Sequence, residues 1–165
     1  PGSYPHMVAD QTNRQQGTSI QSVHYRGEAP MWLDVASGQL QIAVGSFQAF
    51  NAVSTRGVRA IGVTGSYRSP KLPDVPTLTE QGNTEKLVTL EGGLPLVAPA
   101  GTPEAVLKRM ADEAVAWSNT ERAAKLRETF AIPNKPKNLA DTRKDWEGEV
   151  PVWIKLAVDL GIKLD

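Results

Sequence analysis

Three prolines, Pro70, Pro73 and Pro76, fall within the segment from Gly65 to Pro76. Proline has no backbone N–H and a fixed φ, so this segment cannot form a helix interior or a central strand. We therefore expect an extended surface connection there. Because connections of this kind often join two lobes, the segment divides the chain into two parts.

Strand-like and helix-like patterns alternate before this segment. Three strands separated by short helices favour parallel strands joined by crossovers, which predicts an α/β fold. Glycine marks the expected end of the first helix at Gly17, and Pro30 falls in the first turn of the second, where its missing N–H costs nothing. The predicted strands cover residues 20–24, 40–44 and 58–64, and the predicted helices cover residues 4–16, 29–37 and 47–55.

The clearest helix start in the sequence comes after the proline segment. Thr102 is the predicted N-cap, Pro103 takes the first helical position, and Glu104 complements the helix dipole. Apolar side chains then recur at helical spacing and predict one buried stripe: Val106, Leu107, Met110, Ala114 and Trp117. The other elements predicted in this part are a short helix over 77–81, strands over 86–90 and 94–98, and helices over 120–130 and 139–160. We expect Gly148 and Pro151 to bend the last helix.

The composition excludes several classes of function. The 165 residues carry 18 basic and 18 acidic side chains, so no net charge attracts nucleic acid or an anionic membrane. Without cysteine, disulfides and thiol catalysis are excluded. No apolar stretch approaches the roughly 20 residues of a membrane span. No secretory leader is recognisable, so we expect any targeting segment to lie outside these residues.

Catalytic patterns are not found. We interpret neither His6 nor His24, the two histidines, as a metal ligand, and we expect a structural role for His24. Ser46 follows Gly45 without the flanking pattern of a nucleophile elbow. The glycines form neither a Walker loop nor a dinucleotide-binding fingerprint. We therefore predict that the protein is not an enzyme and needs no cofactor or metal.

Small and hydroxylic residues stand where predicted strands or loops pass into helices. These positions are Gly2-Ser3, Tyr25-Arg26-Gly27 and Gly45-Ser46. One edge of a parallel sheet would collect all three, and the unpaired N–H groups of helix N-termini at such an edge suit a carboxylate. The alternative is that these residues only supply the turns and caps that any such fold needs. Spacing alone leaves both interpretations open.

Several motifs occur together in a fixed order. They are Gly17-Thr18, Tyr25-Arg26-Gly27 with Ala29-Pro30, Gly38-Gln39, Arg59 to Thr64, Arg68 to Thr77, Ala98 to Pro103, and Gly161-Ile162-Lys163. In this order and spacing the sequence resembles the solute-binding receptors of tripartite tricarboxylate transporters, also called Bug receptors. The resemblance extends over nearly the whole chain.

The resemblance implies a periplasmic binding protein of the type II-like fold, of which this chain is the C-terminal half. Residues 1–66 would form the core of the second lobe, with a parallel or mixed sheet flanked by helices. Residues 67–90 would connect the lobes, and residues 91–165 would return to the first lobe. The implied function is capture of a small carboxylate or related metabolite for the transporter's membrane subunits. A sensing module that signals to another partner is the alternative.

A ligand site also follows from the resemblance. Its residues would be Gly2, Ser3, Tyr4, Tyr25, Arg26, Gly27, Gly45 and Ser46. Backbone amides near Ser3, the Tyr25 hydroxyl and the Gly45-Ser46 loop would hold the ligand, and Arg26 could pair with a carboxylate. Gly45 stands where many family members carry an acid or amide, so a ligand ammonium would lose one partner.

The resemblance implies that the ligand lies in a cleft between the two lobes and that this chain contains only half of that cleft. We expect either weak ligand binding by the isolated chain or a homodimer that covers its exposed sheet edge. The start of the sequence fits the family motif from Gly2 to His6. The alternative is that His6-Met7 comes from a cloning site and that native sequence begins at Val8.

Overall fold

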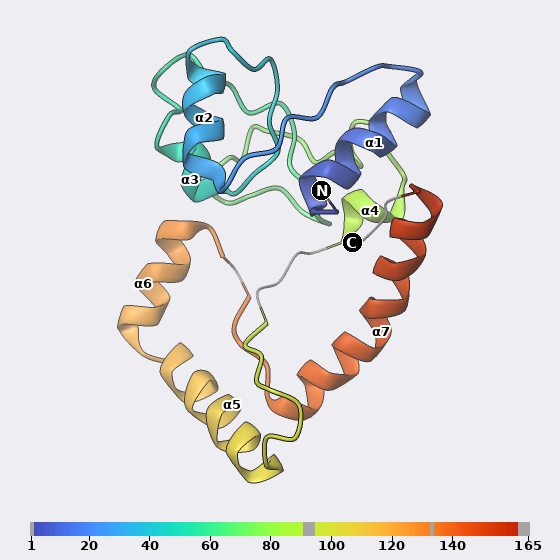
Figure 1. Cartoon of the computed structure of the whole chain (residues 1–165). Coiled ribbons are helices and arrows are strands. Elements are labelled where there is room, and N and C mark those ends of the chain that lie inside the picture. Colours follow the sequence, from blue (N-terminus) through green and yellow to red (C-terminus); the bar gives the residue numbers. More distant parts are fainter. Residues whose placement is uncertain (1, 91–94, 133, 162–165) are drawn as a thin grey trace. The chain divides into compact units, whose positions relative to one another are not determined.

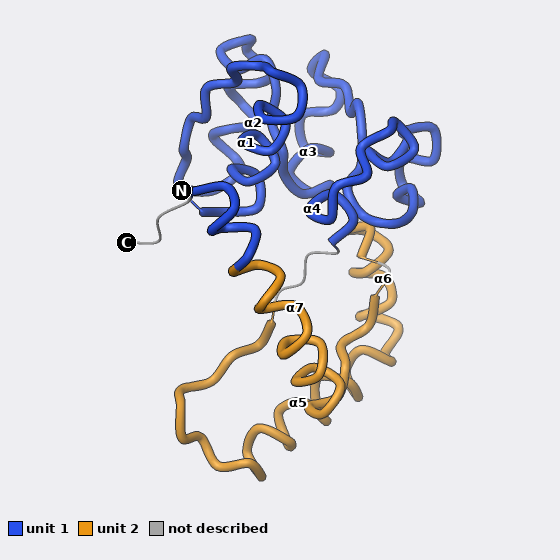
Figure 2. The backbone as a smooth tube through the Cα atoms, turned by 90° about the vertical axis from the view of Figure 1, so that its right-hand side faces the viewer, with its two compact units in different colours: residues 1–91, 155–165 blue, residues 92–154 orange. Residues whose placement is uncertain are grey.

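A computed structural model describes residues 2–90, 95–132 and 134–161. The chain divides into two compact units, unit 1 with residues 1–91 and 155–165 and unit 2 with residues 92–154 (Figure 2). The helices of the described residues are α1 (Tyr4–Gln16), α2 (Glu28–Ala36), α3 (Phe47–Asn51), α4 (Lys86–Thr89), α5 (Glu104–Ser118), α6 (Glu121–Phe130) and α7 (Leu139–Asp159) (Figure 1).

An aromatic core holds α2 and α3 together in unit 1. Trp32, Phe50 and Val53 are buried, and the rings of Trp32 and Phe50 meet edge to face with centroids 5.7 Å apart. Leu72, from the middle of the proline segment, packs against the same cluster. The proline segment is therefore anchored to the core of unit 1.

The proline segment is fixed at its end by the Glu80 carboxylate. Arg68 donates from Nε to both oxygens of Glu80, at 3.1 and 2.9 Å, and from Nη1 to the Pro73 carbonyl. Thr77 and Glu80 form a reciprocal capping box: the Thr77 N–H donates to Glu80 Oε2, and the Glu80 N–H donates to Thr77 Oγ1. The Arg68 guanidinium and the Thr77 amide lower the pKa of Glu80 to about 2.

Helix α1 has the predicted bounds and packs on α4. Ser3 is its N-cap, and Gly17 ends it at φ 60°, a left-handed conformation that glycine adopts without steric cost. Met7 and Val8 are buried, as are Leu87 and Val88 of α4. The side-chain amide of Gln11 donates to Glu85 Oε2 at 3.0 Å. Apolar burial and this polar contact together fix α1 against residues 85–88.

Arg14 joins the first helix to the last turn of α7. Its two Nη atoms donate to the backbone carbonyls of Asp159 and Leu160, at 2.6 and 2.8 Å. These carbonyls lie at the C-terminal end of α7, where helix carbonyls lack partners within the helix and favour a cation. The contact lies within unit 1.

The described residues contain no strand element, so the strands predicted over 20–24, 40–44 and 58–64 are not formed there. An isolated parallel bridge joins Val63 to Thr77. For the strand predicted over 58–64, the backbone hydrogen bonds explain the difference. The Val63 N–H donates to the Pro76 carbonyl, and the Val63 carbonyl accepts from the Leu78 N–H. Backbone groups of the predicted strand thus bind the end of the proline segment, whereas the apolar pattern specified only an extended chain.

Three other predictions for short segments do not hold in the described residues. Residues 86–89 form α4, not a strand, because a brief apolar run does not distinguish a buried helical turn from a strand. Residues 77–81 form hydrogen-bonded turns, not a helix, and Gly82 follows them at φ 92°. Residues 95–98 have no regular structure, and Leu94, in the same predicted strand, lies outside the described residues.

Helix boundaries shift slightly from the predicted ones. α5 begins at Glu104 with Pro103 as its N-cap, so the predicted cap Thr102 lies one residue early, and its hydroxyl donates to the Pro99 carbonyl. α3 ends at Asn51, and turns continue from there to Gly57. The shift at the start of α5 is within the usual ambiguity of one or two residues, whereas α3 ends at Asn51, well before the predicted residue 55.

Unit 2 contains α5, α6 and most of α7. Thr120 caps α6 by accepting from the Ala123 N–H, and Arg127 of α6 donates to the Ser118 carbonyl at the end of α5. Glu104 and Arg143 form a two-point ion pair between α5 and α7, at 2.8 and 2.6 Å. The stripe predicted on α5 is not a buried face, since Val106, Met110 and Trp117 are exposed. Pro151 lies inside α7.

Removal of the Phe50 ring should destabilise unit 1. We expect Phe50→Ala to lower the free energy of unfolding by about 3–5 kcal/mol, because the ring leaves a cavity beside Trp32. Leu33→Ala on the exposed side of α2 is the control and should change stability by about 0.5 kcal/mol or less. Urea unfolding followed by Trp fluorescence measures both, and equal losses for the two variants would contradict this core.

The Glu80 contacts predict a pH dependence of stability. The folded pKa of about 2 lies below the ordinary 4.5, so the stabilising effect is present above pH 4.5 and is lost as the pH falls toward 2. The melting temperature of Glu80→Gln should therefore lie below that of the wild type at neutral pH and approach it near pH 2. Glu121→Gln, at an exposed helix start, is the control. If the melting temperatures of the wild type and Glu80→Gln differ by the same amount at pH 7 and at pH 2, the attribution of the pH dependence to Glu80 is wrong.

Candidate functional site

The start of α1 presents backbone donors that its cap leaves unused. Ser3 is exposed and extended, and its hydroxyl makes no capping hydrogen bond to the helix. The Ser3 carbonyl accepts from the Met7 N–H at 3.0 Å, and the Gly2 N–H donates to Nδ1 of His6. The first N–H groups of an uncapped helix favour an anion. Pro5, in the first turn, has no N–H to contribute, and carboxylate binding at this end of α1 stays a prediction.

Tyr4 faces the interior of unit 1. Its hydroxyl donates to the Leu87 carbonyl of α4 at 3.2 Å, and burial raises the pKa of Tyr4 above its ordinary value. The hydroxyl is therefore engaged in joining α1 to α4. Tyr4, one of the predicted site residues, thus uses its hydroxyl for a hydrogen bond within the protein.

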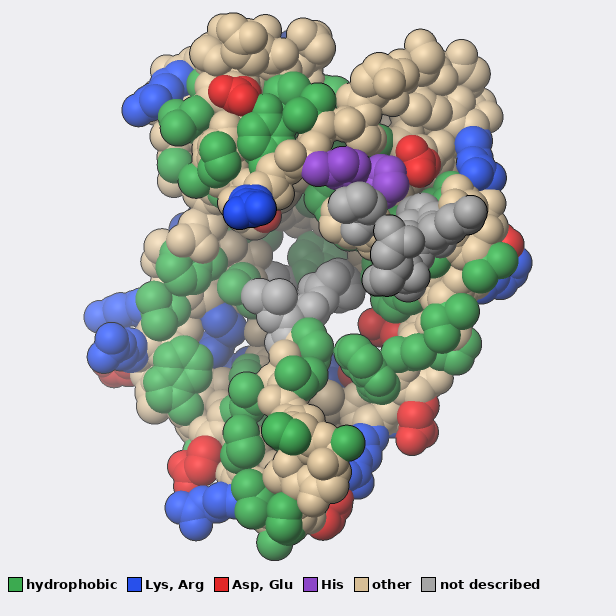
Figure 3. Space-filling view, viewed as in Figure 1, with side chains coloured by type: hydrophobic (Ala, Val, Ile, Leu, Met, Phe, Trp, Pro, Cys, Tyr) green, Lys and Arg blue, Asp and Glu red, His purple; other side chains and the backbone are tan. Residues whose placement is uncertain are grey.

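The two histidines are in contact on the surface of unit 1 (Figure 3). The rings of His6 and His24 meet edge to face with centroids 5.0 Å apart, and Nε2 of His6 lies 3.5 Å from Asp10 Oδ2. Sequence reasoning overlooked Asp10, although it follows His6 by one helical turn. The described residues contain no group of three His, Cys, Asp or Glu placed to hold a metal ion. The His6–His24 contact brings the start of α1 next to Tyr25.

Tyr25 is held by a carboxylate of α2. Its hydroxyl donates to Asp34 Oδ2 at 2.6 Å, and this hydrogen bond raises the pKa of Tyr25. Arg26 is exposed and makes no hydrogen bond or ion pair within the described part of the chain. Gly27 follows at φ 101° as the N-cap of α2, so the helix start has no capping side chain. A free cation and an uncapped helix start therefore lie side by side in the sequence.

Ser46 binds a carboxylate of the protein itself. Its backbone N–H donates to Glu28 Oε2 at 2.9 Å, and its hydroxyl donates to the same oxygen at 2.8 Å. Ser46 also caps α3 by accepting from the Ala49 N–H. The indole N–H of Trp32 donates to the same Glu28 oxygen at 3.4 Å. The donors predicted to hold a ligand carboxylate thus hold Glu28.

Gly45 leaves the space that Glu28 occupies. A Cβ atom at position 45 would lie 2.9 Å from Glu28 Oε2, closer than real Cβ contacts, and 3.1 Å from Trp32 Nε1, which is a tight contact. Sequence reasoning missed Glu28. As the first residue of α2 it reads as a favourable helix-dipole residue, and nothing local indicates that it reaches Ser46, eighteen positions away.

Two contacts link the three predicted segments. The His6–His24 pair joins the start of α1 to the residues before α2, and the Glu28–Ser46 hydrogen bonds join the start of α2 to the start of α3. All these residues lie in unit 1. All three predicted segments therefore belong to unit 1, where Arg26 makes no hydrogen bond to the described residues and no described side chain caps α1 or α2.

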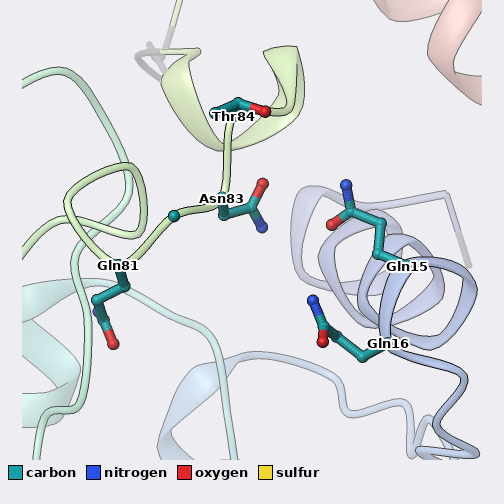
Figure 4. Close-up of a pocket in the computed structure, with 6 residues that line it drawn as sticks. Gln15, Gln16, Gln81, Asn83 and Thr84 are labelled. Atoms are coloured by element: carbon teal, nitrogen blue, oxygen red, sulfur yellow. The ribbon is translucent and has the colours of Figure 1, made fainter.

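A polar pocket lies elsewhere on unit 1 (Figure 4). Its volume is about 400 Å³, and uncharged side chains from the end of α1 and from the turn before α4 line it: Gln15, Gln16, Gln81, Gly82, Asn83 and Thr84. Gln15 is about 18 Å along α1 from Ser3, at a rise of 1.5 Å per residue. The pocket is therefore separate from the predicted site.

Comparison with known proteins identifies relatives of the chain. The family model described as "Tripartite tricarboxylate transporter family receptor" matches residues 1–139. A "UPF0065 protein in tcbD-tcbE intergenic region" of Pseudomonas sp. (strain P51) is 31% identical over 96% of this chain and 47% of its own length. "Protein BugT" of Bordetella pertussis is 26% identical over 90% of this chain and 48% of its own length. The chain thus spans about half the length of these two relatives.

A shorter relative and two solved structures are also similar. A "UPF0065 protein in clcB-clcD intergenic region" of Pseudomonas knackmussii is 26% identical over 95% of this chain and 93% of its own length. The structure "R. palustris Rpa4515 with adipate" matches at 27% identity with a TM-score of 0.76, over 96% of this chain and 53% of that chain. "Structure of periplasmic binding protein BugD" matches at 21% identity with a TM-score of 0.77, over 96% and 54%.

These likenesses bear on the fold prediction. The similarity to BugD confirms a fold of the α/β periplasmic-binding-protein kind for this chain. Of the helices that the structure describes, none has the length and apolar composition required to cross a bilayer.

The Tyr25–Asp34 hydrogen bond predicts a shifted titration. Because the Asp34 carboxylate holds the phenol proton, Tyr25 should ionise at a higher pH than an ordinary tyrosine, and Asp34→Asn should lower its pKa. Absorbance at 295 nm against pH measures this, with Tyr25→Phe identifying the Tyr25 component. Tyr67→Phe is the control that should leave the Tyr25 component in place. An unchanged Tyr25 titration in Asp34→Asn would rule out the contact.

Proposed function

The chain belongs to the tripartite tricarboxylate transporter receptor family, and on this premise we propose that it forms the ligand-binding part of a receptor for a small organic anion. The receptor would deliver its ligand to the membrane subunits of a transporter. Binding would proceed without chemistry, since the proteins matched by name and title are binding receptors rather than enzymes. The comparisons do not favour the alternative of a sensing module.

The family match over residues 1–139 carries this proposal, because it includes all eight predicted site residues. The similar Rpa4515 structure was determined with adipate, a dicarboxylate, which supports a carboxylate-bearing ligand for this chain. The geometry of unit 1 also supports a ligand that carries a carboxylate. Arg26 is an exposed cation that makes no hydrogen bond or ion pair with any described residue, and no described side chain caps the starts of α1 and α2.

The organisation into lobes is part of the proposal. Residues 1–66 would belong to the second lobe of a periplasmic binding protein, residues 67–90 to the connection, and residues 91–165 to the first lobe. In the full receptor, the extended residues 20–24, 40–44 and 58–64 would form a parallel or mixed sheet. The periplasm is the proposed location, as for the relative titled a periplasmic binding protein. The two compact units are divided differently, with boundaries between residues 91 and 92 and between residues 154 and 155.

Ligand binding by this chain can be tested by thermal shift and calorimetry with butanoate, succinate, adipate and citrate. Binding raises stability by RT ln(1 + [L]/Kd), which is about 2.7 kcal/mol at a ligand concentration of 100 Kd. We expect at least one of these anions to raise the melting temperature in a concentration-dependent way. Arg26→Ala should weaken that binding, because it removes the exposed cation beside the start of α2.

Arg56→Ala is the matched control, because Arg56 is another exposed arginine of unit 1 outside the predicted site. It should leave the affinity unchanged. Sedimentation velocity in the same buffers tests the expected homodimer. If no anion shifts the melting temperature of either monomer or dimer, carboxylate capture by this chain is wrong. Tight binding by a monomer would disprove the expectation of weak binding or dimerisation.

A further inference from the structure

Glu28 is the first residue of α2, and its carboxylate is held in one place. Oxygen Oε2 accepts from the Ser46 N–H, the Ser46 hydroxyl and the Trp32 indole N–H. Trp32 is buried in the aromatic core, with 7% of its surface exposed. Hydrogen bonds to an ionised acceptor are stronger than those between neutral groups. The orientation of Glu28 is therefore fixed by a rigid neighbour and by the Gly45-Ser46 loop.

Occupation of Ser46 changes what can bind nearby. The amide and hydroxyl of Ser46 are both engaged by Glu28, so neither remains free for a carboxylate of a ligand. A second carboxylate at this loop would also meet a like charge, which disfavours binding. Oxygen Oε1 of Glu28 accepts no hydrogen bond from the described residues. One oxygen of the Glu28 carboxylate is thus left as an acceptor beside the loop, without a hydrogen bond from the described residues.

We propose that Glu28 determines ligand specificity at this end of the site: it excludes a ligand carboxylate from the Gly45-Ser46 loop and accepts a hydrogen bond from an ammonium, amide or hydroxyl group. The inference rests on the proposed function. The ligand class that fits is a small organic acid with one carboxylate and a hydrogen-bond donor at its other end. Its carboxylate would bind the free donors near Arg26 and the start of α1.

Gly45 provides a way to disturb Glu28 without removing its charge. A methyl group at position 45 would lie 2.9 Å from Glu28 Oε2, so Gly45→Ala must displace the carboxylate or the loop. Glu28→Ala instead removes the carboxylate and frees the donors of Ser46. Both variants should weaken discrimination between ligand classes, by different routes.

Matched pairs of probes test the proposal by calorimetry on this chain. The pairs are succinate with 4-aminobutanoate and adipate with 6-aminohexanoate, which differ in the group at one end. For the wild type we expect the amino acid of at least one pair to bind about tenfold more tightly than its dicarboxylate. In Glu28→Ala the ratio of the two dissociation constants should fall by at least about tenfold, and the dicarboxylate should gain affinity.

The control is Glu121→Ala. Glu121 is the first residue of α6, so this substitution removes the same charge from an equivalent helix position. It should leave the ratio unchanged. Circular dichroism shows whether each variant is folded. The NMR signal of the Trp32 indole N–H gives a second readout. It should shift when 6-aminohexanoate is added to the wild type, and it should shift without any probe in Gly45→Ala.

The outcomes separate the two proposals. Binding of dicarboxylates in preference to amino acids by the wild type overturns the role of Glu28 and leaves the proposed function intact. The same holds if folded Glu28→Ala keeps the wild-type ratio. If none of the four probes and none of the anions tested above binds, the proposed function fails and this inference fails with it.

Discussion

The Glu80 carboxylate is the contact on which the arrangement of unit 1 depends. It receives the Arg68 guanidinium and the Thr77 amide, and so it closes the proline segment into a loop. With the loop closed, Leu72 reaches the aromatic core and Thr77 pairs with Val63. Prolines make such a segment stiff but give it few backbone donors of its own. A single exposed ion pair is weak, so the capping box and the apolar contact of Leu72 must act with it.

The features that could be predicted are those that depend on residues close together in the sequence. The end of α1 follows from Gly17 and the start of α6 from Thr120, because stops and caps act over a few residues. Strand pairing could not be predicted in this way. Val63 pairs with the end of the proline segment, and α4 forms where a short apolar run fitted a strand equally well.

The hydrogen-bond partners of the predicted site residues could not be predicted from the sequence either. Ser46 was identified as a donor for a carboxylate, and the structure gives it a carboxylate, that of Glu28. The prediction concerned a ligand carboxylate, whereas the observed partner of Ser46 belongs to the protein. Tyr4 and Tyr25 likewise engage Leu87 and Asp34. Polar side chains at a site edge bind each other as readily as they bind a ligand, and sequence spacing does not tell which occurs.

The contact between Arg14 and the end of α7 joins two parts of unit 1 that lie far apart in the sequence. Arg14 donates to the carbonyls of Asp159 and Leu160, 145 and 146 positions further along the chain, in the part of α7 that belongs to unit 1. The entropic cost of bringing the ends of a loop together grows only slowly with loop length. One guanidinium can therefore join the first helix to the end of the last one without a closure cost in proportion to the chain between them.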